Sequence, residues 1–386
     1  MATLARRVVR RLPLIPFFPK GASSMAARKQ SHTPRTHAPP KCDDHDANGN
    51  QIADGLIYCD DSEPGLRRLR TKDGAFRYVD AQGHAVRDKT TLARIRTLAI
   101  PPAYENVWIC PTGNGHIQAT GRDARGRKQY RYHPDWTTSR NADKFQHLTV
   151  FGAALPRIRR RVHADLARPG LPPERVLALV VTLLERTLIR IGSDEYAKEN
   201  RSYGLTTLAR RHTKVAGNQI RLTFTGKSGV AHDVTIRDRR LARLVRRCMD
   251  IPGQRLFQYQ DEDGDRHAID SSMVNDYLRA AGADDFTTKH YRTWAASVQA
   301  FELLRGDAAA SRSAVIKRVA RTLANTPAVC RNCYIHPAVL QAHENATLPG
   351  GGPAPASPRG LSAAERRFLA FLRRHDLSPS GSSVTE

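Results

Sequence analysis

The sequence has few cysteines and no long apolar run, and both absences limit the kind of protein that it encodes. Six cysteines are spread over 386 residues, whereas secreted disulfide scaffolds are shorter and much richer in cysteine. We therefore expect a reducing compartment. Cys330 and Cys333 form a lone CxxC pair without a second pair at metal spacing, so we expect one helical turn with both side chains packed inward. No stretch reaches the roughly 18 apolar residues that span a bilayer.

Acidic residues are scarce relative to basic ones. The chain has 37 Asp and Glu residues against 62 Lys and Arg residues, which gives a formal net charge of +25 and a pI of about 10.4. So much charge of one sign repels itself unless a polyanion is near. Nucleic acid is therefore the leading expected partner, and an anionic membrane is the second.

Both ends of the chain lack the periodicity of folded segments. Residues 1–55 carry nine Lys and Arg residues before the first acidic one, Asp43, and we expect a disordered basic arm there. The composition of its start is also similar to that of a mitochondrial presequence, and Met25 is an alternative start of the protein. We expect a location in bacterial cytoplasm, with organelle targeting as the alternative. Residues 346–386 combine a Gly- and Pro-rich linker with a short basic helix.

Residues 56–150 have the turns and alternation of a β-rich domain. Asp73-Gly74 separates two alternating runs, and a Gly-Asn-Gly turn at 113–115 separates two more. Such turns between alternating runs predict two β-hairpins.

Residues 151–345 have mainly helical periodicity. The predicted fold class is therefore α+β, with a small β-rich N-terminal domain and a mainly helical second domain that contains a β-hairpin at 218–236. An almost wholly apolar segment, 175–192, predicts a buried helix that ends at a glycine. Further helices are expected over 240–250, 271–281, 293–305 and 312–323.

A short helix is expected just before the C-terminal linker. Thr326 suits the N-cap position and Pro327 the first helical position. Pro337 limits the helix on its other side. Tyr334 is therefore expected about two turns into this helix.

Five polar residues stand at unusual positions in the second domain: Arg190, Lys227, Arg292, Asn325 and Tyr334. Each has an ordinary explanation, since an arginine can favour a helix C-terminus and a lysine at a hairpin tip is usually solvated. Together, however, they are the groups that phosphoryl transfer at a phosphodiester requires.

Guanidinium groups hold two non-bridging phosphate oxygens bidentately, and an amide can donate to the same oxygens. A phenol can attack phosphorus, and a lysine can protonate the departing alkoxide. No carboxylate cluster or His/Cys set with metal spacing lies near these residues in the sequence. We therefore expect neither a two-metal mechanism nor any cofactor.

Several motifs, at matching spacing over residues 62–345, resemble those of the bacterial and poxvirus-like type IB DNA topoisomerases. They are GRKQYRYH (126–133), LIRIGSDEYAKEN (188–200), FTGKSG (224–229), KHYRTW (289–294) and NTPAVCRNCYIHP (325–337). The resemblance implies two catalytic arginines, a hairpin lysine and a tyrosine nucleophile, at Arg190, Arg292, Lys227 and Tyr334. Asn325 stands where viral and eukaryotic members are expected to have histidine, whereas bacterial members resemble this chain. A neutral amide implies a weaker or less pH-sensitive contact.

The resemblance also implies a fold and a mechanism. The two domains would clamp double-stranded DNA in a C shape. One strand would be nicked and held as a 3′-phosphotyrosine, the free 5′-hydroxyl end would rotate, and the strand would be resealed without ATP or metal. We expect a monomer with no obligate protein partner.

The segment KQYRYH resembles the strand with which the family reads DNA. Tyr130 and Tyr132 would point one way along it, while Gln129 and Arg131 point the other. Gln and Arg side chains can pair bidentately with adenine and guanine edges. In the alternative, the tyrosines belong to the core and only the charges contact phosphate. Lys289, beside the second arginine, is a further expected DNA contact.

Two other functions remain open at this point. A tyrosine recombinase shares the Arg, Lys, Arg and Tyr chemistry, but recombinases resemble one another in a His-x-x-Arg element where this chain has Lys289 and Arg292. A noncatalytic DNA-binding protein would explain the charge and the two tyrosines. It would not explain an arginine at the end of a core helix.

Overall fold

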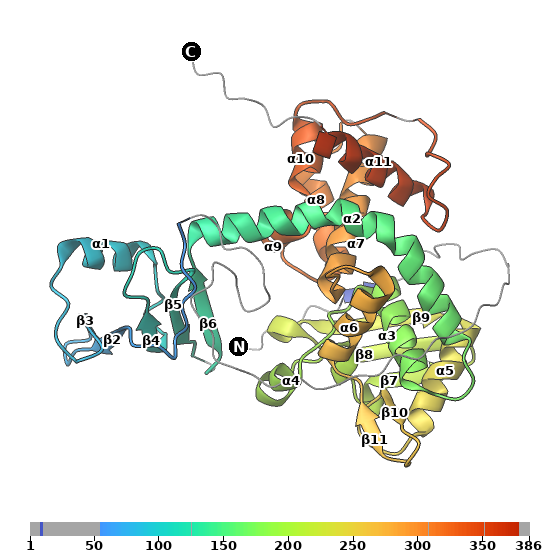
Figure 1. The fold of residues 1–386 in the computed structure, drawn as a ribbon, viewed down its shortest axis with the longest axis horizontal. Coiled ribbons are helices and arrows are strands. Elements are labelled where there is room, and N and C mark those ends of the chain that lie inside the picture. Colours follow the sequence, from blue (N-terminus) through green and yellow to red (C-terminus); the bar gives the residue numbers. More distant parts are fainter. Residues whose placement is uncertain (1–7, 11–54, 125, 308, 351, 378–386) are drawn as a thin grey trace. The chain divides into compact units, whose positions relative to one another are not determined.

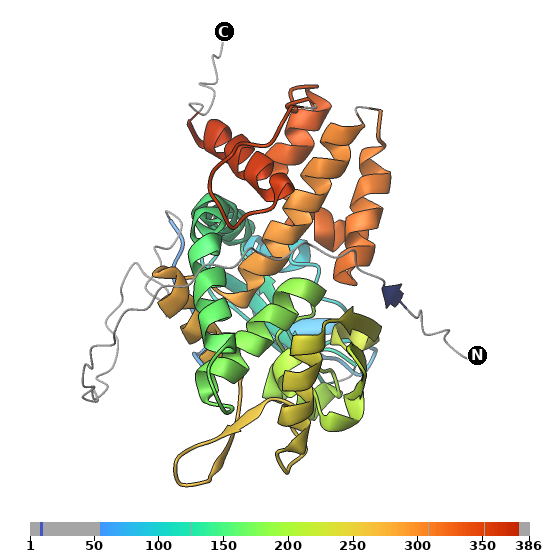
Figure 2. The same ribbon diagram turned by 90° about the vertical axis from the view of Figure 1, so that its right-hand side faces the viewer.

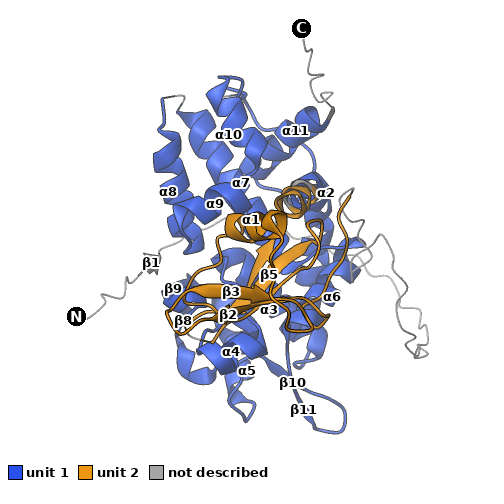
Figure 3. Cartoon of the chain, turned by 90° about the vertical axis from the view of Figure 1, so that its left-hand side faces the viewer, with its two compact units in different colours: residues 1–21, 144–386 blue, residues 22–143 orange. Residues whose placement is uncertain are grey.

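The computed structural model describes residues 8–10, 55–124, 126–307, 309–350 and 352–377. The chain divides into two compact units, one formed by residues 22–143 and the other by residues 1–21 and 144–386 (Figure 3). The expected arm at 1–55 and the alternative start at Met25 lie outside the described residues, except for residues 8–10 and Gly55. Among the described helices, none is long and apolar enough to cross a membrane.

The smaller unit contains a five-stranded antiparallel sheet in the order β3-β2-β4-β5-β6. Its elements are β2 (Leu66–Arg70), β3 (Phe76–Val79), α1 (Lys89–Thr97), β4 (Glu105–Ile109), β5 (Ile117–Arg122) and β6 (Lys128–Tyr132). Both predicted hairpins are confirmed, with β2 paired to β3 and β4 paired to β5. Gly74 occupies the first turn at a φ of +84°, where residues with a side chain are strained.

Helix α1 was not expected from the alternation of this region. It begins after Asp88, whose carboxylate accepts a hydrogen bond from the backbone N–H of Thr91 at 2.7 Å. Such a cap satisfies one of the free donors at a helix start. Ile95 of α1 is buried with Leu66 and Ile109 of the sheet, so the helix covers one of its faces.

Helix α2, Pro134–Leu166, corrects the expectation that strands continue to residue 150. Proline suits the first turn of a helix because its missing N–H would have no intrahelical partner there. The buried side chains of α2 recur at helical spacing from Leu148 through Leu155 to Val162. The two units meet in sequence after Asp143, inside this helix.

The larger unit is mainly helical, and the expected combination of a small β-rich region with a helical part is confirmed (Figure 1). Its remaining helices are α3 (Pro173–Thr187), α4 (Asp194–Asn200), α5 (Arg239–Asp250), α6 (Ser271–Gly282), α7 (Thr288–Gly306), α8 (Arg312–Leu323), α9 (Pro327–Cys333), α10 (Pro337–Glu344) and α11 (Ala363–Leu377). Its strands and short 3-10 turns are β1 (Val8–Arg10), η1 (Leu205–Thr207), η2 (Arg210–His212), β7 (Thr213–Ala216), β8 (Gln219–Thr225), η3 (Lys227–Gly229), β9 (Ala231–Arg237), β10 (Gln258–Gln260) and β11 (Arg266–Ala268).

The expected hairpin of this unit is confirmed as β8 and β9, which pair from Gln219 with Arg237 to Thr225 with Ala231. They belong to a four-stranded sheet in the order β1-β9-β8-β7. Strand β1 pairs in parallel with β9, so these three residues are ordered within a segment that we expected to be disordered. Val8 and Val9 are β-branched, which favours a strand.

Helix α3 is the buried core helix, but it ends earlier than its apolar pattern predicts. Leu188 follows Thr187 in the left-handed conformation, at a φ of 54°. The next residues do not continue the helix and instead form backbone hydrogen bonds with another segment. Leu205 N–H donates to the Arg190 carbonyl at 2.9 Å. Arg190 therefore lies in the irregular segment between α3 and α4 rather than in the last turn of the helix.

Helices α8, α10 and α11 pack against α7 (Figure 2). Helix α7 begins at Thr288, before the expected residue 293, because the N–H of Thr287 donates to His290 Nδ1 at 2.9 Å and caps an additional turn. The short basic helix expected near the C-terminus is α11. The ring of Phe368 in α11 packs edge to face against the ring of Trp294 in α7, with 5.2 Å between the ring centres.

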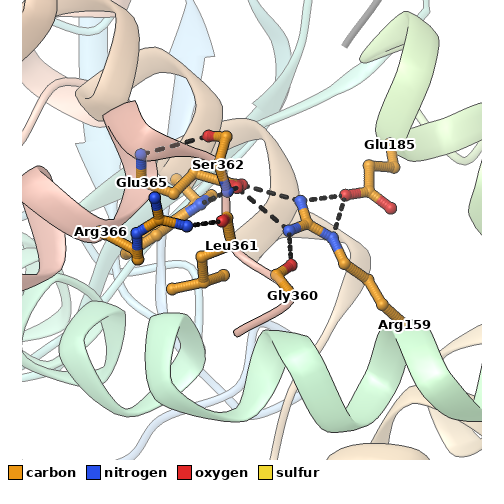
Figure 4. A network of polar contacts seen from close by, with 8 residues as sticks. Arg159, Glu185, Gly360, Leu361, Ser362, Glu365 and Arg366 are labelled. Atoms are coloured by element: carbon orange, nitrogen blue, oxygen red, sulfur yellow. Dashed lines mark hydrogen bonds and ion pairs between the residues drawn. The ribbon is translucent and has the colours of Figure 1, made fainter. Parts of the chain in front are cut away.

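A buried ionic network joins α11 to α2 and α3 (Figure 4). Arg159 donates to Glu185 and to both carboxylate oxygens of Glu365. Trp294 Nε1 also donates to Glu365, at 3.1 Å. Burial opposes the charge of Arg159, but the two carboxylates outweigh it and raise the pKa of the guanidinium above its usual range. Helix α11, which lies in the segment 346–386 that we expected to be a linker and a short basic helix, is thus part of the core of this unit.

Candidate active site

Tyr334 follows the end of α9 instead of lying within it. The start of the helix is confirmed, with Thr326 Oγ1 accepting from Val329 N–H at 3.3 Å and Pro327 in the first turn. At the other end, the N–H groups of Tyr334 and Ile335 both donate to the Cys330 carbonyl, at 3.1 and 3.0 Å. This shared acceptor ends the helix, and Tyr334 takes a non-helical φ of −130°.

The backbone around Tyr334 is fixed by a buried serine of α7. Ser297 Oγ donates to the Tyr334 carbonyl at 3.0 Å and accepts from His336 N–H at 2.9 Å. Ser297 has no exposed surface, so both bonds are shielded from water. The nucleophile candidate is therefore attached to the same helix that carries Arg292.

Lys144 of α2 approaches the tyrosine from another element. Its ammonium donates to the Cys333 carbonyl and lies 5.9 Å from the centre of the Tyr334 ring. Burial lowers the pKa of Lys144, and the nearby charge of Lys289 acts in the same direction. We expected both cysteines of the CxxC pair to pack inward. Cys330 is buried as expected, whereas Cys333 is only half-buried.

Arg292 is buried, with 4% of its surface exposed, although it carries a charge. Its guanidinium donates to the Leu188 carbonyl and, at 3.0 Å, to the Leu323 carbonyl. Its Cζ lies 5.2 Å from the centre of the Tyr334 ring. Burial lowers the pKa of Arg292, whereas Tyr334 raises it. Nε is buried and has no partner among the described residues.

Arg190 and Asn325 are 135 positions apart in sequence and are hydrogen-bonded. Arg190 Nη2 donates to Asn325 Oδ1 at 3.0 Å. This bond orients the amide, whose Nδ2 is buried without a partner among the described residues. A buried donor without an acceptor is unfavourable unless an external group supplies one. The pair therefore offers a guanidinium and a free amide N–H to an anion.

Lys227 lies at the tip of the β8–β9 hairpin, as the sequence predicts. It opens the short turn η3, and its side chain is exposed. Its Nζ lies 5.5 Å from the centre of the Tyr196 ring on α4. Ser228 and Gly229 have positive φ values of 63° and 75°, so the tip is a tight turn.

The structure thus gathers Tyr334, Arg292, Arg190 and Asn325 and places Lys227 at the tip of the β8–β9 hairpin. Two guanidinium groups, together with an amide N–H that is unpaired among the described residues and a nearby phenol, are the kinds of group that can bind a phosphate ester. In the part of the chain that the structure describes, no group of three His, Cys, Asp or Glu side chains is placed to hold a metal ion.

The predicted DNA-reading residues lie in the smaller unit. Tyr130 and Tyr132 are exposed by 44% and 46%, and their rings stack at 5.9 Å. The alternative that these tyrosines belong to the core is therefore wrong. Gln129 Nε2 donates to Asp123 at 3.1 Å, and Arg131 donates to the Ala99 carbonyl at 3.1 Å. Lys289, in the larger unit, is exposed on the first turn of α7.

Sequence reasoning missed Lys144 and Ser297. Lys144 lies in the segment that we expected to be β-rich, and no turn or motif marks it. Ser297 lies five residues after Arg292 in a helix that was expected, but a serine in a helix interior has no pattern of its own. A signal was available only in the position of Ser297 on the face of α7 that also carries buried Ala300 and Phe301.

Comparison with known proteins agrees with this geometry. Residues 133–348 match the model of the eukaryotic DNA topoisomerase I catalytic core. Residues 75–123 match the model of the bacterial DNA topoisomerase IB N-terminal domain. The first match contains all five residues of the candidate site.

Two similar proteins are themselves named DNA topoisomerase 1B. The chain is 31% identical to DNA topoisomerase 1B of Acanthamoeba polyphaga mimivirus over 296 residues, which cover 73% of this chain and 88% of the relative. It is 24% identical to DNA topoisomerase 1B of Vaccinia virus (strain Copenhagen) over 242 residues, which cover 62% of this chain and 75% of the relative. Two family models in sequence order and a relative of this similarity lead to one conclusion: the chain belongs to the type IB DNA topoisomerase family.

Proposed function

We propose that this DNA topoisomerase relaxes supercoils by cutting one strand with Tyr334 and resealing it. The observation that carries the proposal is the position of the Tyr334 ring beside the buried Arg292 guanidinium, 5.2 Å from its Cζ. Arg190 and the amide of Asn325, unpaired among the described residues, complete the set of donors. A phosphodiester there would meet a nucleophile and three groups that stabilise its developing charge.

The cleavage step makes one bond and breaks one bond. Tyr334 Oη bonds to phosphorus as the P–O5′ bond breaks, which leaves a 3′-phosphotyrosyl ester and a 5′-hydroxyl. Arg190, Arg292 and Asn325 bind the non-bridging oxygens. Lys227 donates a proton to the departing 5′ oxygen, and the phenolic proton leaves to solvent. Resealing is the same reaction in reverse.

Neither ATP nor a metal ion is required in this scheme. The phosphotyrosyl ester keeps the bond energy of the cleaved phosphodiester, so resealing needs no external energy. Arginine and lysine side chains supply the positive charge that a metal ion supplies in two-metal nucleases. Between the two steps, the 5′-hydroxyl end rotates and the supercoil relaxes.

The β-rich unit has a role in holding DNA in this proposal. We infer that the two units close around duplex DNA as a C-shaped clamp and that the protein acts as a monomer in bacterial cytoplasm.

Exposed Tyr130 and Tyr132 make β6 a suitable strand for the major groove. Gln129 is held by Asp123 in the free protein, so base contact would require exchange of that bond. Gln129→Ala should then change which sequences are cleaved, and an unchanged cleavage map would reject base reading by this residue.

Relaxation of a supercoiled plasmid with EDTA and without ATP tests the proposed function. We expect full relaxation by the wild-type chain and none by Tyr334→Phe, which lacks only the attacking hydroxyl. Tyr334→Phe should bind DNA nearly as well as wild type and form no covalent adduct in denaturing gels. A strict requirement for magnesium or ATP, or an adduct on another tyrosine, would refute the mechanism.

A further inference from the structure

Two buried cysteines of the smaller unit lie next to each other, outside the candidate active site. Cys59 lies in the segment before β2, and Cys110 directly follows β4. The side chains are 5% and 1% exposed, and together with Trp108 they form a small apolar cluster. Both are free thiols. The smaller unit therefore contains a thiol pair that the proposed DNA chemistry does not use.

The glycine at position 115 leaves room for both sulfur atoms. A Cβ atom at Gly115 would lie 2.4 Å from Cys110 Sγ and 2.9 Å from Cys59 Sγ, which is closer than such atoms approach one another in proteins. Both sulfurs are therefore close to the same point of the chain. They are also near enough for the Cys59 thiol to hydrogen-bond to Cys110.

Backbone hydrogen bonds hold the two cysteines in this position. His116 N–H donates to the Ile57 carbonyl at 2.9 Å, and Cys59 N–H donates to His116 Nδ1 at 3.1 Å. These bonds attach the segment of Cys59 to the start of β5. Cys110 N–H donates to the Gln118 carbonyl at 3.0 Å and is held to the same strand. The two thiols are thus brought together by the sheet rather than by proximity in sequence.

The two thiols differ in acidity. A hydrogen bond from Cys59 lowers the pKa of the Cys110 thiol to about 6, and Thr112 and the charge of Arg94 act in the same direction against the effect of burial. The same hydrogen bond, together with burial, raises the pKa of Cys59 above its usual range. By contrast, burial raises the pKa of Cys248 to about 12. At neutral pH the pair therefore combines a thiolate with a thiol, and the thiolate is the nucleophilic form.

We propose that Cys59 and Cys110 are an oxidation site that closes to a disulfide when the protein meets a hydroperoxide. Cys110 Sγ attacks one peroxide oxygen, so that an S–O bond forms and the O–O bond breaks. With hydrogen peroxide, the departing hydroxide takes a proton from solvent and leaves as water. Cys59 Sγ then attacks the sulfenic sulfur of Cys110, and the S–O bond breaks as the S–S bond forms. The second hydroxide leaves as water with the Cys59 proton, so two thiols are oxidised and one peroxide is reduced.

The disulfide would fasten a surface segment beneath the strand proposed to contact DNA. Tyr58 stacks on His116 at 4.3 Å between ring centres, and His116 lies 6.4 Å from the ring of Tyr132 on β6. Ile57 and Tyr58 are exposed, so local opening of this surface segment can admit a small oxidant. Closure would restrict that opening and stabilise the smaller unit. Intracellular disulfides of this kind are usually transient and redox-sensing.

The first measurement is peptide mapping of the full chain after treatment with hydrogen peroxide and alkylation of the remaining thiols. The wild-type chain should give a Cys59–Cys110 peptide that dithiothreitol separates. Cys248→Ala is the matched control, because it removes a buried cysteine of the other unit, and it should give the same peptide. Cys42→Ala should also give it, which separates this pair from a cysteine outside the described residues.

Single variants test the direction of the reaction. Cys59→Ala should accumulate a sulfenic acid at Cys110 that dimedone traps, whereas Cys110→Ala should leave Cys59 unmodified. The rate of disulfide formation in the wild-type chain should rise from pH 5 and level off above about pH 7, because Cys110 is already ionised there. An ordinary cysteine, with a pKa of about 8.5, would continue to gain rate up to about pH 9.

The second measurement compares the oxidised and reduced wild-type chains. A disulfide removes conformational freedom from the unfolded chain, so the thermal transition of the smaller unit should rise by at least about 5 °C. Single-turnover cleavage of a short duplex should stay within about twofold of the reduced protein, since neither cysteine belongs to the candidate site. If the reduced chain cleaves no DNA at all, the proposed function fails, and peptide mapping still tests the oxidation site.

Several outcomes would overturn the inference. A Cys59–Cys110 peptide that forms only in urea would show that the folded protein does not react. Pairing of Cys59 or Cys110 with Cys42 instead would show that the observed neighbours are not the reacting pair. Trapping of sulfenic acid at Cys59 in Cys110→Ala, and none at Cys110 in Cys59→Ala, would reverse their roles. An oxidised protein that unfolds at a lower temperature than the reduced one would exclude stabilisation by this bond.

Discussion

Arg190 holds Asn325 by its oxygen, with Nη2 donating to Oδ1 at 3.0 Å. The bond determines which end of the amide faces the site, because an amide that accepts through oxygen must present its NH₂ on the other side. Asn325 Nδ2 is buried and unpaired among the described residues. The arginine thus orients the amide donor beside it, and in our proposal the two side chains bind one phosphate together.

Asn325→Ala should slow cleavage by roughly 10- to 100-fold, since one hydrogen bond to a charged group contributes about 1.5–3 kcal/mol. Asn325→His should restore much of the rate at low pH only. A free imidazole has a pKa of about 6.5, so the charged donor is present below that pH and lost above it. Single-turnover cleavage measured from pH 5 to 8 checks this, with wild type as the control. A flat profile for Asn325→His would argue against contact with the phosphate.

Lys227→Ala should slow cleavage of ordinary DNA by roughly 10²–10⁴, the usual contribution of general acid catalysis. Replacing the bridging 5′ oxygen by sulfur makes the leaving group a thiolate that needs no proton. Lys227→Ala should then cleave the sulfur substrate at close to the wild-type rate. Arg190→Ala and Arg292→Ala should be slow on both substrates, because they bind non-bridging oxygens. Rescue of an arginine variant by sulfur, without rescue of Lys227→Ala, would reverse these roles.

Ser297→Ala should impair cleavage without weakening DNA binding. The substitution leaves the Tyr334 carbonyl and the His336 N–H without their buried partner, and an unsatisfied buried group costs about 1–3 kcal/mol. We expect a loss in single-turnover rate of roughly tenfold or more at saturating DNA. Thr182→Val is the matched control, since it removes another buried hydroxyl, bonded only within α3. An equal loss of rate in both variants would show a general effect of destabilisation.

Glu365→Ala should destabilise the larger unit by about 3–5 kcal/mol, the range for removing one partner of a buried ion pair. Arg159 would keep Glu185 but lose its contacts with both Glu365 oxygens. Asp276→Ala is the control, because its ion pair with Arg279 is exposed and such pairs contribute less than about 1 kcal/mol. Urea unfolding at neutral pH compares them. Similar midpoints for the two variants would contradict a structural role for α11.

Acid should destabilise the larger unit through His336 and His290. Burial lowers the pKa of each to about 4, whereas the unfolded chain titrates near 6.5. The unfolded state therefore binds more protons between these values, and stability falls as pH drops from about 6.5 to about 4, by up to roughly 3 kcal/mol for each residue. His336→Asn keeps a cap for Ala338 N–H and should remove about half of this loss. Urea midpoints at pH 7 and 5 measure it, and an unchanged difference would exclude His336.

Local features were predictable from the sequence, and long-range ones were not. The hairpin tip at Lys227 and the start of α9 depend on glycine, threonine and proline within a few residues, and both were predicted. The end of α3 was not predicted, because it depends on the left-handed conformation of Leu188 and on a bond from the distant Leu205 N–H to the Arg190 carbonyl. The contact of Lys144 with Cys333 spans 189 positions and follows from packing alone. The five candidate site residues were proposed from their chemistry and motif spacing, whereas the burial of Arg292 required the structure.

The bond between Arg159 and Glu365 spans 206 positions and has a consequence for synthesis of the chain. A ribosome releases the N-terminal residues first, and domains fold as their parts emerge. Arg190, Lys227 and Arg292 leave the ribosome well before Tyr334, and Glu365 leaves later still. A chain that ends before Glu365 would keep Glu185 as the partner of Arg159 but would lack both bonds to Glu365. Under the proposed function, the proposed phosphate-binding residues are therefore synthesised before Tyr334, the proposed nucleophile.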